Sequence, residues 1–438
     1  MRRFFWLRIV FTFAFALNVL SASQPTYADQ NWWNLAWHYR VSIPVPAGGY
    51  TRMDKPAEKN VDFTNLLLTL GASGSTLEVD SLRVVEVSNV QGDTILDAAV
   101  KFQFDEAASF DATTHALGSL VILMNGTTLT NTTRYYHLYF DTTAHGPFTP
   151  FSFTPQVTVT TVVNYADQDS FKAQTANATY YYHKRGAGFA SMIDVEGKDW
   201  ISYNLSNSPG AAGIFRGIPN MGVWAHPGFP EQGSGGSVGS TSVISTTTGP
   251  LKAVISSTST DGFRSLTWAI YPTYATMALL SKPSGENYWF LYEGTPYGAL
   301  DPDQDYYQLS NGTRMNVPVN ESVTLSSDIV DPEWVFFGDS NTSRALFVAH
   351  HEDDDIQDYF RQQGDAMTVF GFGRKDPCCV SDFRLLTAVP AHFTIGFGET
   401  QATMTQTINS AYLNLGTITL GQPEALNQVF VYLPLILR

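Results

Sequence analysis

The chain has 438 residues, with 40 Asp and Glu against 25 Lys and Arg, and its formal net charge of −15 argues against a nucleic-acid partner. An anionic polysaccharide would be repelled as well, unless the fold forms a local basic pocket. A composition of 44% hydrophobic and 13% aromatic residues suffices for extensive cores and excludes a disordered chain.

The N-terminus has the pattern of a secretory signal. Arg2 and Arg3 precede an apolar stretch from Phe4 to Leu20, and a small-x-small sequence ends at Ala28. We therefore expect residues 1–28 to be cleaved, which predicts a secreted or cell-surface protein with no stable membrane span. The alternative is an uncleaved anchor, because the stretch approaches the ~18 residues that a spanning helix needs.

Alternation of polar and apolar residues predicts half-buried strands in the next part of the chain. These strands are Tyr39 to Pro44, Leu82 to Val87, Ala99 to Phe104 and Tyr135 to Phe140. Clusters of Gly, Asn, Asp and Ser separate them, which favours an antiparallel β-sandwich over residues 29–145. Three prolines in the segment HGPFTPFSFTP then predict a stiff linker over residues 146–156.

The two ends of this first domain carry a recognisable pattern. It opens with residues 32–37 (WWNLAW) and 39–43 (YRVSI), and it closes with residues 134–141 (RYYHLYFD). These segments resemble an uncharacterised extracellular bacterial β-sandwich module that is often joined to lectin-like or carbohydrate-processing domains. The resemblance implies an accessory role and no catalytic residue. Trp32, Trp33 and Trp37 either form a sugar-stacking platform or anchor the first strand in the core.

Residues 157–412 continue as short strands and turns, and the best short helix is Asp355 to Gln363, capped by the acidic run from Asp353. The segments GAGFAS, RGIPN, WFLYEGTP and HHEDDD resemble secreted bacterial proteins of unassigned function that look carbohydrate-active. By analogy with sugar mutarotases, we expect a larger, supersandwich-like β-sandwich here. The whole chain is thus predicted to be all-β, ending in a C-terminal strand or sorting tail over residues 413–438.

Charged and aromatic groups gather at several places in this second region. The tyrosine-rich residues 180–182 lead into His183, Lys184 and Arg185, the densest group of cationic residues in the chain. This group could bind a carboxylate or a sulfate, although a solvated turn has the same composition. A second group, Arg216, Trp224 and His226, lies in a Gly/Pro-rich loop. Such a loop is either a binding loop or an ordinary connection between strands. The predicted substrate-binding residues are His183, Lys184, Arg185, Arg216, Trp224 and Tyr292.

Four residues are predicted to be catalytic: Glu293, His226, His350 and His351. Glu293 ends a hydrophobic strand beside aromatic residues, where a carboxylate can acquire a raised pKa and act as acid or base; a plain edge carboxylate is the alternative. Strand alternation would direct His350 and His351 to opposite faces. If the protein is an enzyme, we expect Glu293, His350 or His226 to lie with Arg216 in one cleft.

A divalent metal such as calcium is a further possibility. Glu352 and Asp353, with one histidine, could bind such an ion, although their spacing matches no standard metal motif and the acidic run is also explained as a helix cap. The two cysteines, Cys378 and Cys379, are adjacent and provide no disulfide framework.

Two functions remain open on this sequence, and both have extracellular polysaccharide as the partner. The first is a glycan-cleaving enzyme, either a glycoside hydrolase with paired carboxylates or a polysaccharide lyase with a Tyr or His base. The second is a non-catalytic carbohydrate-binding or cell-surface protein.

Overall fold

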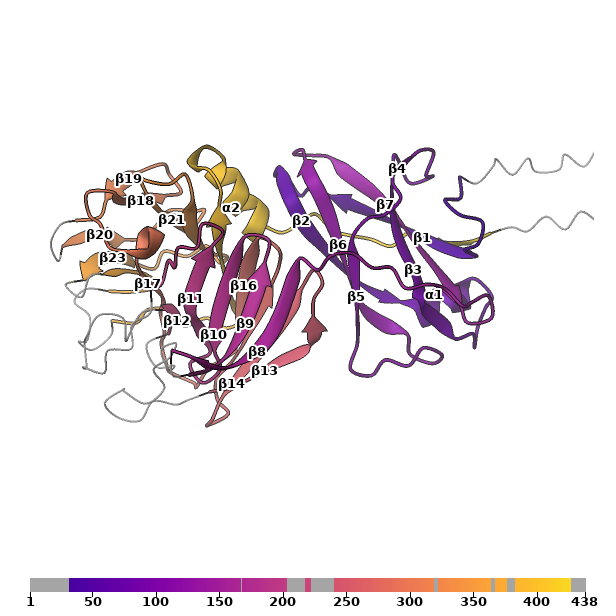
Figure 1. Ribbon diagram of the computed structural model, residues 1–438, viewed down its shortest axis with the longest axis horizontal. Helices are drawn as coiled ribbons and strands as arrows, with labels where there is room; N and C mark the ends of the chain where they lie inside the picture. The colour runs from indigo at the N-terminus through magenta and orange to yellow at the C-terminus, as the bar shows by residue number, and fades with distance from the viewer. Residues whose placement is uncertain are drawn as a thin grey trace, which may run out of the picture.

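The computed structural model describes residues 31–166, 168–202, 217–221, 240–318, 322–363, 367–375 and 383–426. It shows two β-sandwiches joined end to end, the N-terminal one in indigo and purple (Figure 1). The described chain is mostly antiparallel strand with two α-helices, so the all-β prediction is confirmed. No helix in these residues is both long and apolar enough to cross a membrane.

The N-terminal sandwich packs a five-stranded sheet on a three-stranded one. Val41, Ile43 and Val45 alternate along one strand and are all 0% exposed, because every second side chain points into the core. Helix α1 (Phe63–Thr69) follows directly on a strand, and the Asp62 side chain caps it by accepting the N–H of Asn65. The first sheet has the order β26 (Pro423–Ala425), β1 (Tyr39–Pro46), β7 (Thr133–Thr142), β3 (Leu77–Val87) and β4 (Ile95–Asp97), and the second β2 (Arg52–Asp62), β6 (Leu117–Thr128) and β5 (Phe102–Glu106).

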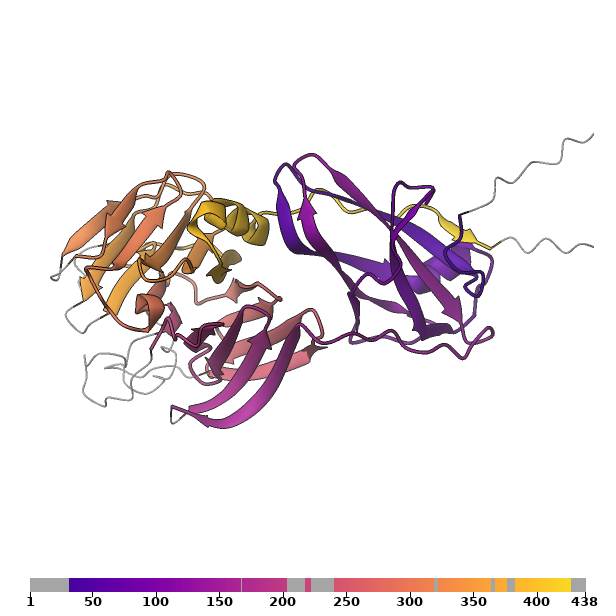
Figure 2. The same cartoon turned by 45° about the horizontal axis from the view of Figure 1, so that its top comes forward.

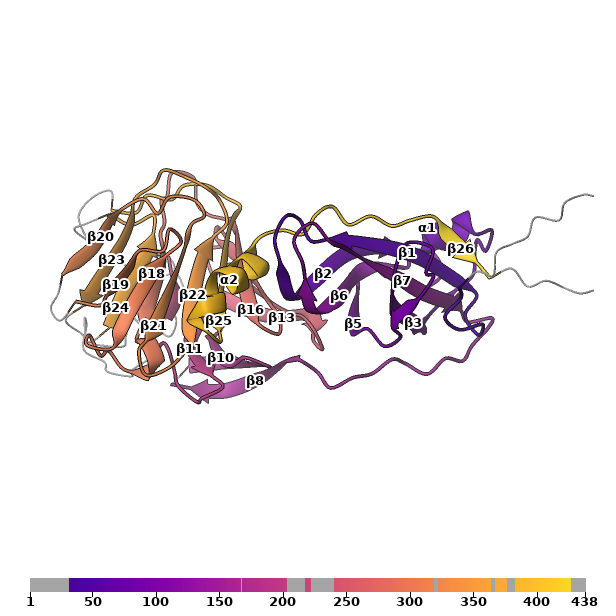
Figure 3. The ribbon, with the colours of Figure 1, turned by 90° about the horizontal axis from the view of Figure 1, so that it is seen from above.

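Both ends of the chain build this first sandwich. After the second sandwich, the chain returns along the first one, as the yellow segment of Figure 3 shows. Leu415, Ile418 and Leu420 pack against the N-terminal core, and β26 then pairs with β1, with Ala425 opposite Tyr39. The edge of the first sheet is therefore covered by residues nearly 400 positions away in sequence.

The second sandwich consists of two nine-stranded antiparallel sheets, which we call the β17 sheet and the β22 sheet. Aromatic side chains fill the space between them, for example Phe290 stacked on Phe393 with ring centroids 4.1 Å apart. The β17 sheet has the order β20 (Val323–Ser327), β23 (Asp358–Gln363), β24 (Met367–Phe372), β17 (Phe290–Gly294), β12 (Gly217–Asn220), β11 (Gly188–Asp194), β10 (Ala178–His183), β9 (Gln168–Thr175) and β8 (Val157–Tyr165). The β22 sheet has the order β13 (Ser240–Thr248), β14 (Ala253–Ser259), β15 (Ser265–Ile270), β16 (Tyr274–Ser281), β25 (Ala391–Gly398), β22 (Ala345–His350), β21 (Trp334–Asp339), β18 (Asp305–Leu309) and β19 (Arg314–Asn316).

Helix α2 (Met404–Tyr412) covers the outer face of the β22 sheet and lies between the two sandwiches (Figure 2). Met404 and Ile408, one turn apart, are both 0% exposed against Phe347 and its neighbours. Two one-turn 3₁₀ helices complete the structure, at Pro296–Gly298 and Gln401–Thr403. Helix α2 therefore lies next to β2 of the first sandwich.

The helix predicted from Asp355 to Gln363 is wrong, because this segment contains strand β23, which pairs with β20 and β24. Phe360 enters the core between the sheets, whereas the ring of Tyr359 lies under Arg374 on the other face, and both are fully buried. Consecutive side chains point to opposite faces in a strand, and here both faces are buried. This burial stabilises the strand more than the acidic run would stabilise a helix N-terminus.

Candidate functional site

Glu293 and Tyr292 lie on opposite faces of β17. The Tyr292 ring is in the core between the sheets, 0% exposed, and its hydroxyl donates to the Trp200 carbonyl at 2.7 Å. Glu293 faces the outside of the sheet, where its carboxylate accepts a hydrogen bond from Asn220 at 3.2 Å and Asn220 in turn accepts one from the Trp289 indole at 3.3 Å. Tyr292 therefore belongs to the core in this structure.

The loop residues predicted to join Glu293, namely Arg216, Trp224 and His226, lie outside the described residues. Gly217, which follows Arg216 in the chain, is the β-ladder partner of Glu293. Arg374 lies on the same outer face, with its guanidinium 5.3 Å from the Trp289 ring centre. A site formed by these loop residues around Glu293 stays a prediction.

The cationic triplet at the end of β10 is largely neutralised. His183 is 0% exposed, and burial, only partly offset by a hydrogen bond to the Tyr165 backbone, lowers its pKa to about 4. Lys184 pairs with Asp169 at 2.9 Å and lies 4.6 Å from the centre of the Phe171 ring. Arg185 is exposed and Lys184 is partly exposed beside its acidic partner, so a substrate contact at this triplet stays a prediction.

His350 lies between the two sheets, so it does not share a face with Glu293. Its Nδ1 is 2.6 Å from Glu333 and its Nε2 is 3.3 Å from Glu352. Burial opposes the charged ring, but the hydrogen bonds to these two carboxylates prevail and raise the pKa of His350 to about 9. Burial likewise works against the Glu352 carboxylate, yet its contacts with His350 and His392 lower its pKa to about 2.

The predicted metal ligands are only partly brought together at this point. Carboxylate oxygens of Glu333 and Asp354 lie within 4.8 Å of a His350 nitrogen, Glu352 contacts the same ring, and Asp353 is exposed. A protonated imidazole has no lone pair for a metal. The arrangement is therefore that of a buried ion-pair network, and a metal at Glu352 and Asp353 stays a prediction.

His351 points away from His350, as strand alternation requires. Its Nε2 is 2.7 Å from Thr394 Oγ1 on the outer face of the β22 sheet, and its ring meets Tyr412 of α2 edge-on at 5.4 Å. Burial is the main reason that the pKa of His351 is lowered to about 3, so the ring is neutral. His351 thereby faces the space between the two sandwiches.

An interdomain cleft of about 500 Å³ occupies that space. Strand β2 forms one wall, the outer faces of β15 and β16 form another, and α2 with the segment after it closes the third. The side chains on which the chemistry of the cleft depends are Lys55, Glu58, Lys59, Tyr271, Tyr274 and His351.

Interdomain contacts hold the walls of this cleft in place. Glu58 of β2 accepts hydrogen bonds from Lys252, at 2.6 Å, and from the Tyr271 hydroxyl, both in the second sandwich. Arg52 donates to the carbonyls of Asn409 and Leu413 at 3.0 and 2.9 Å, at the C-terminal end of α2. The cleft is therefore a built feature of the fold.

Two lysines give the cleft a local positive charge. Lys55 donates to the Ala411 carbonyl at 2.6 Å and lies 5.0 Å from the centre of the Tyr274 ring, and Lys59 donates to the Ile418 carbonyl at 2.9 Å. Burial, reinforced by the charge of Arg52 and only partly opposed by Glu58, lowers the pKa of Lys55 to about 7. Strand β2 was not predicted, because its sequence RMDKPAEKNVD is rich in charges and lacks apolar alternation. The high density of charged residues in this segment was the one sequence feature that could have indicated a functional surface.

No protein-family model matches this chain, and no curated protein matches it. Its structure is similar to an α-mannosidase from Enterococcus faecalis V583, with 10% identity, a TM-score of 0.41, and 90% of this chain and 47% of that chain covered. A protein in glycosyl hydrolase family 38 from Enterococcus faecalis gives 9% identity, a TM-score of 0.41, and 90% and 48% coverage. HI1317 gives 13% identity and a TM-score of 0.36, with 56% of this chain and 97% of that chain covered. This chain thus spans about half the length of the two Enterococcus proteins, and the similarities are distant and assign no family.

Proposed function

We propose that this is an extracellular, polysaccharide-directed protein that binds an acidic glycan in its interdomain cleft. The observation that carries the proposal is the presence of Lys55 and Lys59 beside tyrosine rings in a cleft of about 500 Å³, in a chain whose net charge is −15. This is the local basic pocket without which an acidic polymer would be repelled. The signal-like pattern of residues 1–28 supports an encounter outside the cell.

The walls of the cleft suit a sugar ring. Tyr271, Tyr274 and Tyr412 line the cleft, and Tyr271 is the partly exposed one, so its ring is the surface against which the C–H face of a sugar can pack. Thr267, Thr276 and the cleft lysines add hydrogen-bonding groups at the positions where sugar hydroxyls would lie. A volume of about 500 Å³ falls within the usual range of ligand sites, which occur preferentially at domain interfaces.

A carboxylated sugar fits the charges better than a neutral one. Glu58 is already held by Lys252 and Tyr271, so it compensates only part of the charge of the two cleft lysines. Lys55 is 8% exposed, and its lowered pKa measures how strongly burial disfavours its charge. A uronate carboxylate entering the cleft would restore that charge through an ion pair.

A second candidate function, glycan cleavage by a lyase mechanism, is favoured by Lys55 alone. A pKa of about 7 leaves a large neutral fraction at neutral pH, which is what a general base needs. In such a reaction the Lys55 amine takes the proton α to the uronate carboxylate, the bond from C4 to the leaving oxygen breaks, a C=C bond forms, and the oxygen leaves protonated. The proton on that oxygen would come from the Tyr271 hydroxyl, which lines the same cleft and would have to release Glu58, to which it donates in this structure.

A polysaccharide panel tests both candidates. The purified mature protein would be run through affinity gels containing acidic or neutral polysaccharides, and the same mixtures assayed for reducing ends and for the absorbance of unsaturated uronates. We expect retardation by an acidic polysaccharide. New absorbance would establish the lyase, whereas retardation without product would establish the binder. Free migration through every gel, with no product, would contradict the proposed function.

A further inference from the structure

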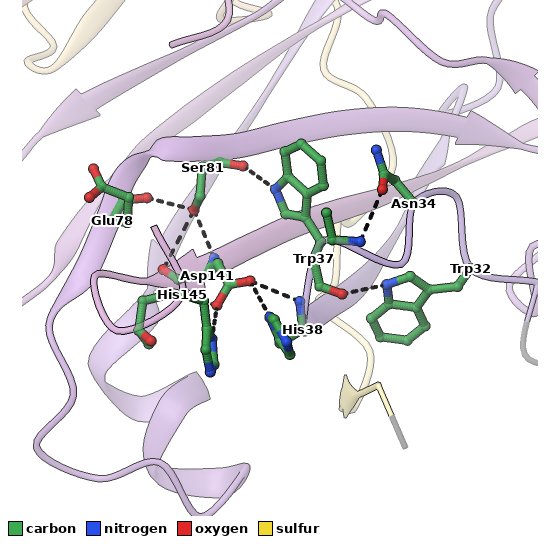
Figure 4. A network of polar contacts seen from close by, with 10 residues as sticks. Trp32, Asn34, Trp37, His38, Glu78, Ser81, Asp141 and His145 are labelled. Carbon is green, nitrogen blue, oxygen red and sulfur yellow. Dashed lines mark hydrogen bonds and ion pairs between the residues drawn. The ribbon is translucent and has the colours of Figure 1, made fainter. Parts of the chain in front are cut away.

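A second cluster of chemistry-bearing side chains lies in the N-terminal sandwich, and none of its members lines the interdomain cleft. His38 directly precedes β1, Asp141 lies in β7, and His145 follows in the turn after β7. Because β1 and β7 are paired, with Tyr39 opposite Phe140, the three residues meet at one end of the sheet. Figure 4 shows both imidazole rings directed at the Asp141 carboxylate.

The carboxylate of Asp141 is fully buried and held on both oxygens. Oδ2 accepts the backbone N–H of His38 at 2.9 Å and lies 2.8 Å from His38 Nδ1. Oδ1 accepts the backbone N–H of Thr142 at 2.8 Å and lies 2.6 Å from His145 Nδ1. The two backbone donors fix the orientation of the carboxylate, and both histidines present Nδ1 to it.

No Lys or Arg within the described ranges forms an ion pair with Asp141. The side-chain partners of its buried carboxylate are the imidazole rings of His38 and His145, which are stacked with centroids 3.7 Å apart. A cation bound between the three side chains would compensate the buried carboxylate charge.

We propose that His38 Nδ1, His145 Nδ1 and one Asp141 oxygen bind a single divalent transition-metal ion, for which Zn²⁺ is the best match. The three donor atoms lie within 4.8 Å of one another. Two imidazole nitrogens and one carboxylate oxygen are typical zinc ligands, and a three-residue set leaves the fourth position open to water or a ligand. Ca²⁺ does not suit the site, because it takes six to eight oxygens. This inference is independent of the proposed glycan function.

Metal binding requires the two rings to leave their present stack, because an imidazole nitrogen binds a metal in the plane of its ring. The present N–O contacts of 2.6 and 2.8 Å are hydrogen-bond distances, whereas two ligands of a tetrahedral zinc ion lie about 3.3 Å apart. The His145 side chain is 34% exposed and follows the end of its strand, so its ring is the one that would turn outward. His38 is 22% exposed, which leaves the site accessible from solvent.

The other cluster with metal-like composition, Glu333 with His350 and Asp354, differs in a decisive way. There the histidine is only 3% exposed and is shared by several carboxylates, which hold it as an imidazolium. In the N-terminal cluster two histidines share one carboxylate, which is the mixed nitrogen and oxygen ligand set of many zinc sites.

Calorimetric titration of Zn²⁺ into the mature protein, after treatment with a chelator, tests this assignment. The variants are His145→Ala, His145→Gln and His38→Ala. The matched control is His115→Ala, which removes an exposed histidine from another loop of the same sandwich. We expect one Zn²⁺ per chain for the wild type and the control, and binding at least ~10-fold weaker for each cluster variant. Circular dichroism of the metal-free proteins checks that the variants are folded.

Two results would overturn the assignment. One is a wild type that binds no Zn²⁺; the other is a folded His145→Ala or His145→Gln variant that binds as tightly as the wild type. A His350→Gln variant locates any ion at the second cluster, since His350 is the one nitrogen ligand of that cluster. Loss of zinc binding in that variant, with binding retained in the His145 variants, would place the ion there and would also refute the assignment.

Discussion

His350 and His351 are neighbours in sequence but occupy opposite electrostatic environments. Between the sheets, Glu333 and Glu352 hold His350 in its charged form, with a pKa of about 9. On the outer face, burial against α2 keeps His351 neutral, with a pKa of about 3. Alternation along a strand predicts that the two side chains diverge, but it cannot predict which one meets carboxylates, because Glu333 is 17 residues away in sequence.

These shifts predict how stability depends on pH. For His350 the folded pKa lies above the ordinary value of 6.5, so its contribution is complete below pH 6.5 and is lost as the pH rises through about 9. For His351 the folded pKa lies below 6.5, so stability is lost as the pH falls from 6.5 toward 3. We expect urea unfolding of the second sandwich to show maximal stability near pH 6.5.

His350→Gln should remove about 3 kcal/mol of the loss in unfolding free energy on the alkaline side, and His351→Gln should reduce the loss on the acidic side. The slope of the unfolding free energy with pH is the quantity to compare, because either variant also lowers the absolute stability. His115→Gln, an exposed substitution, serves as the control and should preserve both sides. An unchanged alkaline side in His350→Gln would show that the ion pair with Glu333 is not formed in solution.

At the scale of elements, local pattern and distant pairing contribute differently. Strands β1, β3 and β7 were predicted because their alternation is contained in their own sequences. The pairing of β1 with β26 was beyond prediction, because a three-residue strand has no period and its partner is nearly 400 residues away. Strand β2, which forms one wall of the cleft, was missed for want of apolar alternation.

The return segment tests this account of the N-terminal sandwich. A Cβ atom added to Gly421 would lie 2.2 Å from Ser42 Oγ and 3.5 Å from the Ser42 carbonyl oxygen. Gly421→Ala should therefore displace β26 from β1 and destabilise the first sandwich by about 1–3 kcal/mol. Urea unfolding and limited proteolysis near the C-terminus measure the two effects.

The neighbouring substitution Gln422→Ala, at an exposed side chain, is the control and should leave both measurements unchanged. If Gly421→Ala proves as resistant to proteolysis as this control, the return segment does not dock as the structure shows.

At the scale of the whole molecule, the function proposed here depends on how the two sandwiches meet. Leu251 is 0% exposed against Val121 and Leu123 of the first sandwich, and Gln103 accepts the N–H groups of Leu251 and Lys252 at 2.7 and 2.9 Å. These contacts place Lys252 beside Glu58 and so form one side of the cleft. The net charge can be read from the sequence, whereas the location of a basic pocket cannot, because the pocket arises only where β2 meets the second sandwich.

The most direct test is calorimetric titration of an acidic oligosaccharide that the affinity gels identify, together with its neutral analogue. The double variant Lys55→Met/Lys59→Gln removes both cleft charges, and Lys101→Gln/Lys282→Gln removes two lysines that do not line the cleft. Two lost charged hydrogen bonds should weaken binding of the acidic ligand at least ~10-fold in the cleft variant and leave the control at wild-type affinity. Equal affinity of the folded cleft variant and the wild type for the acidic ligand would contradict the account.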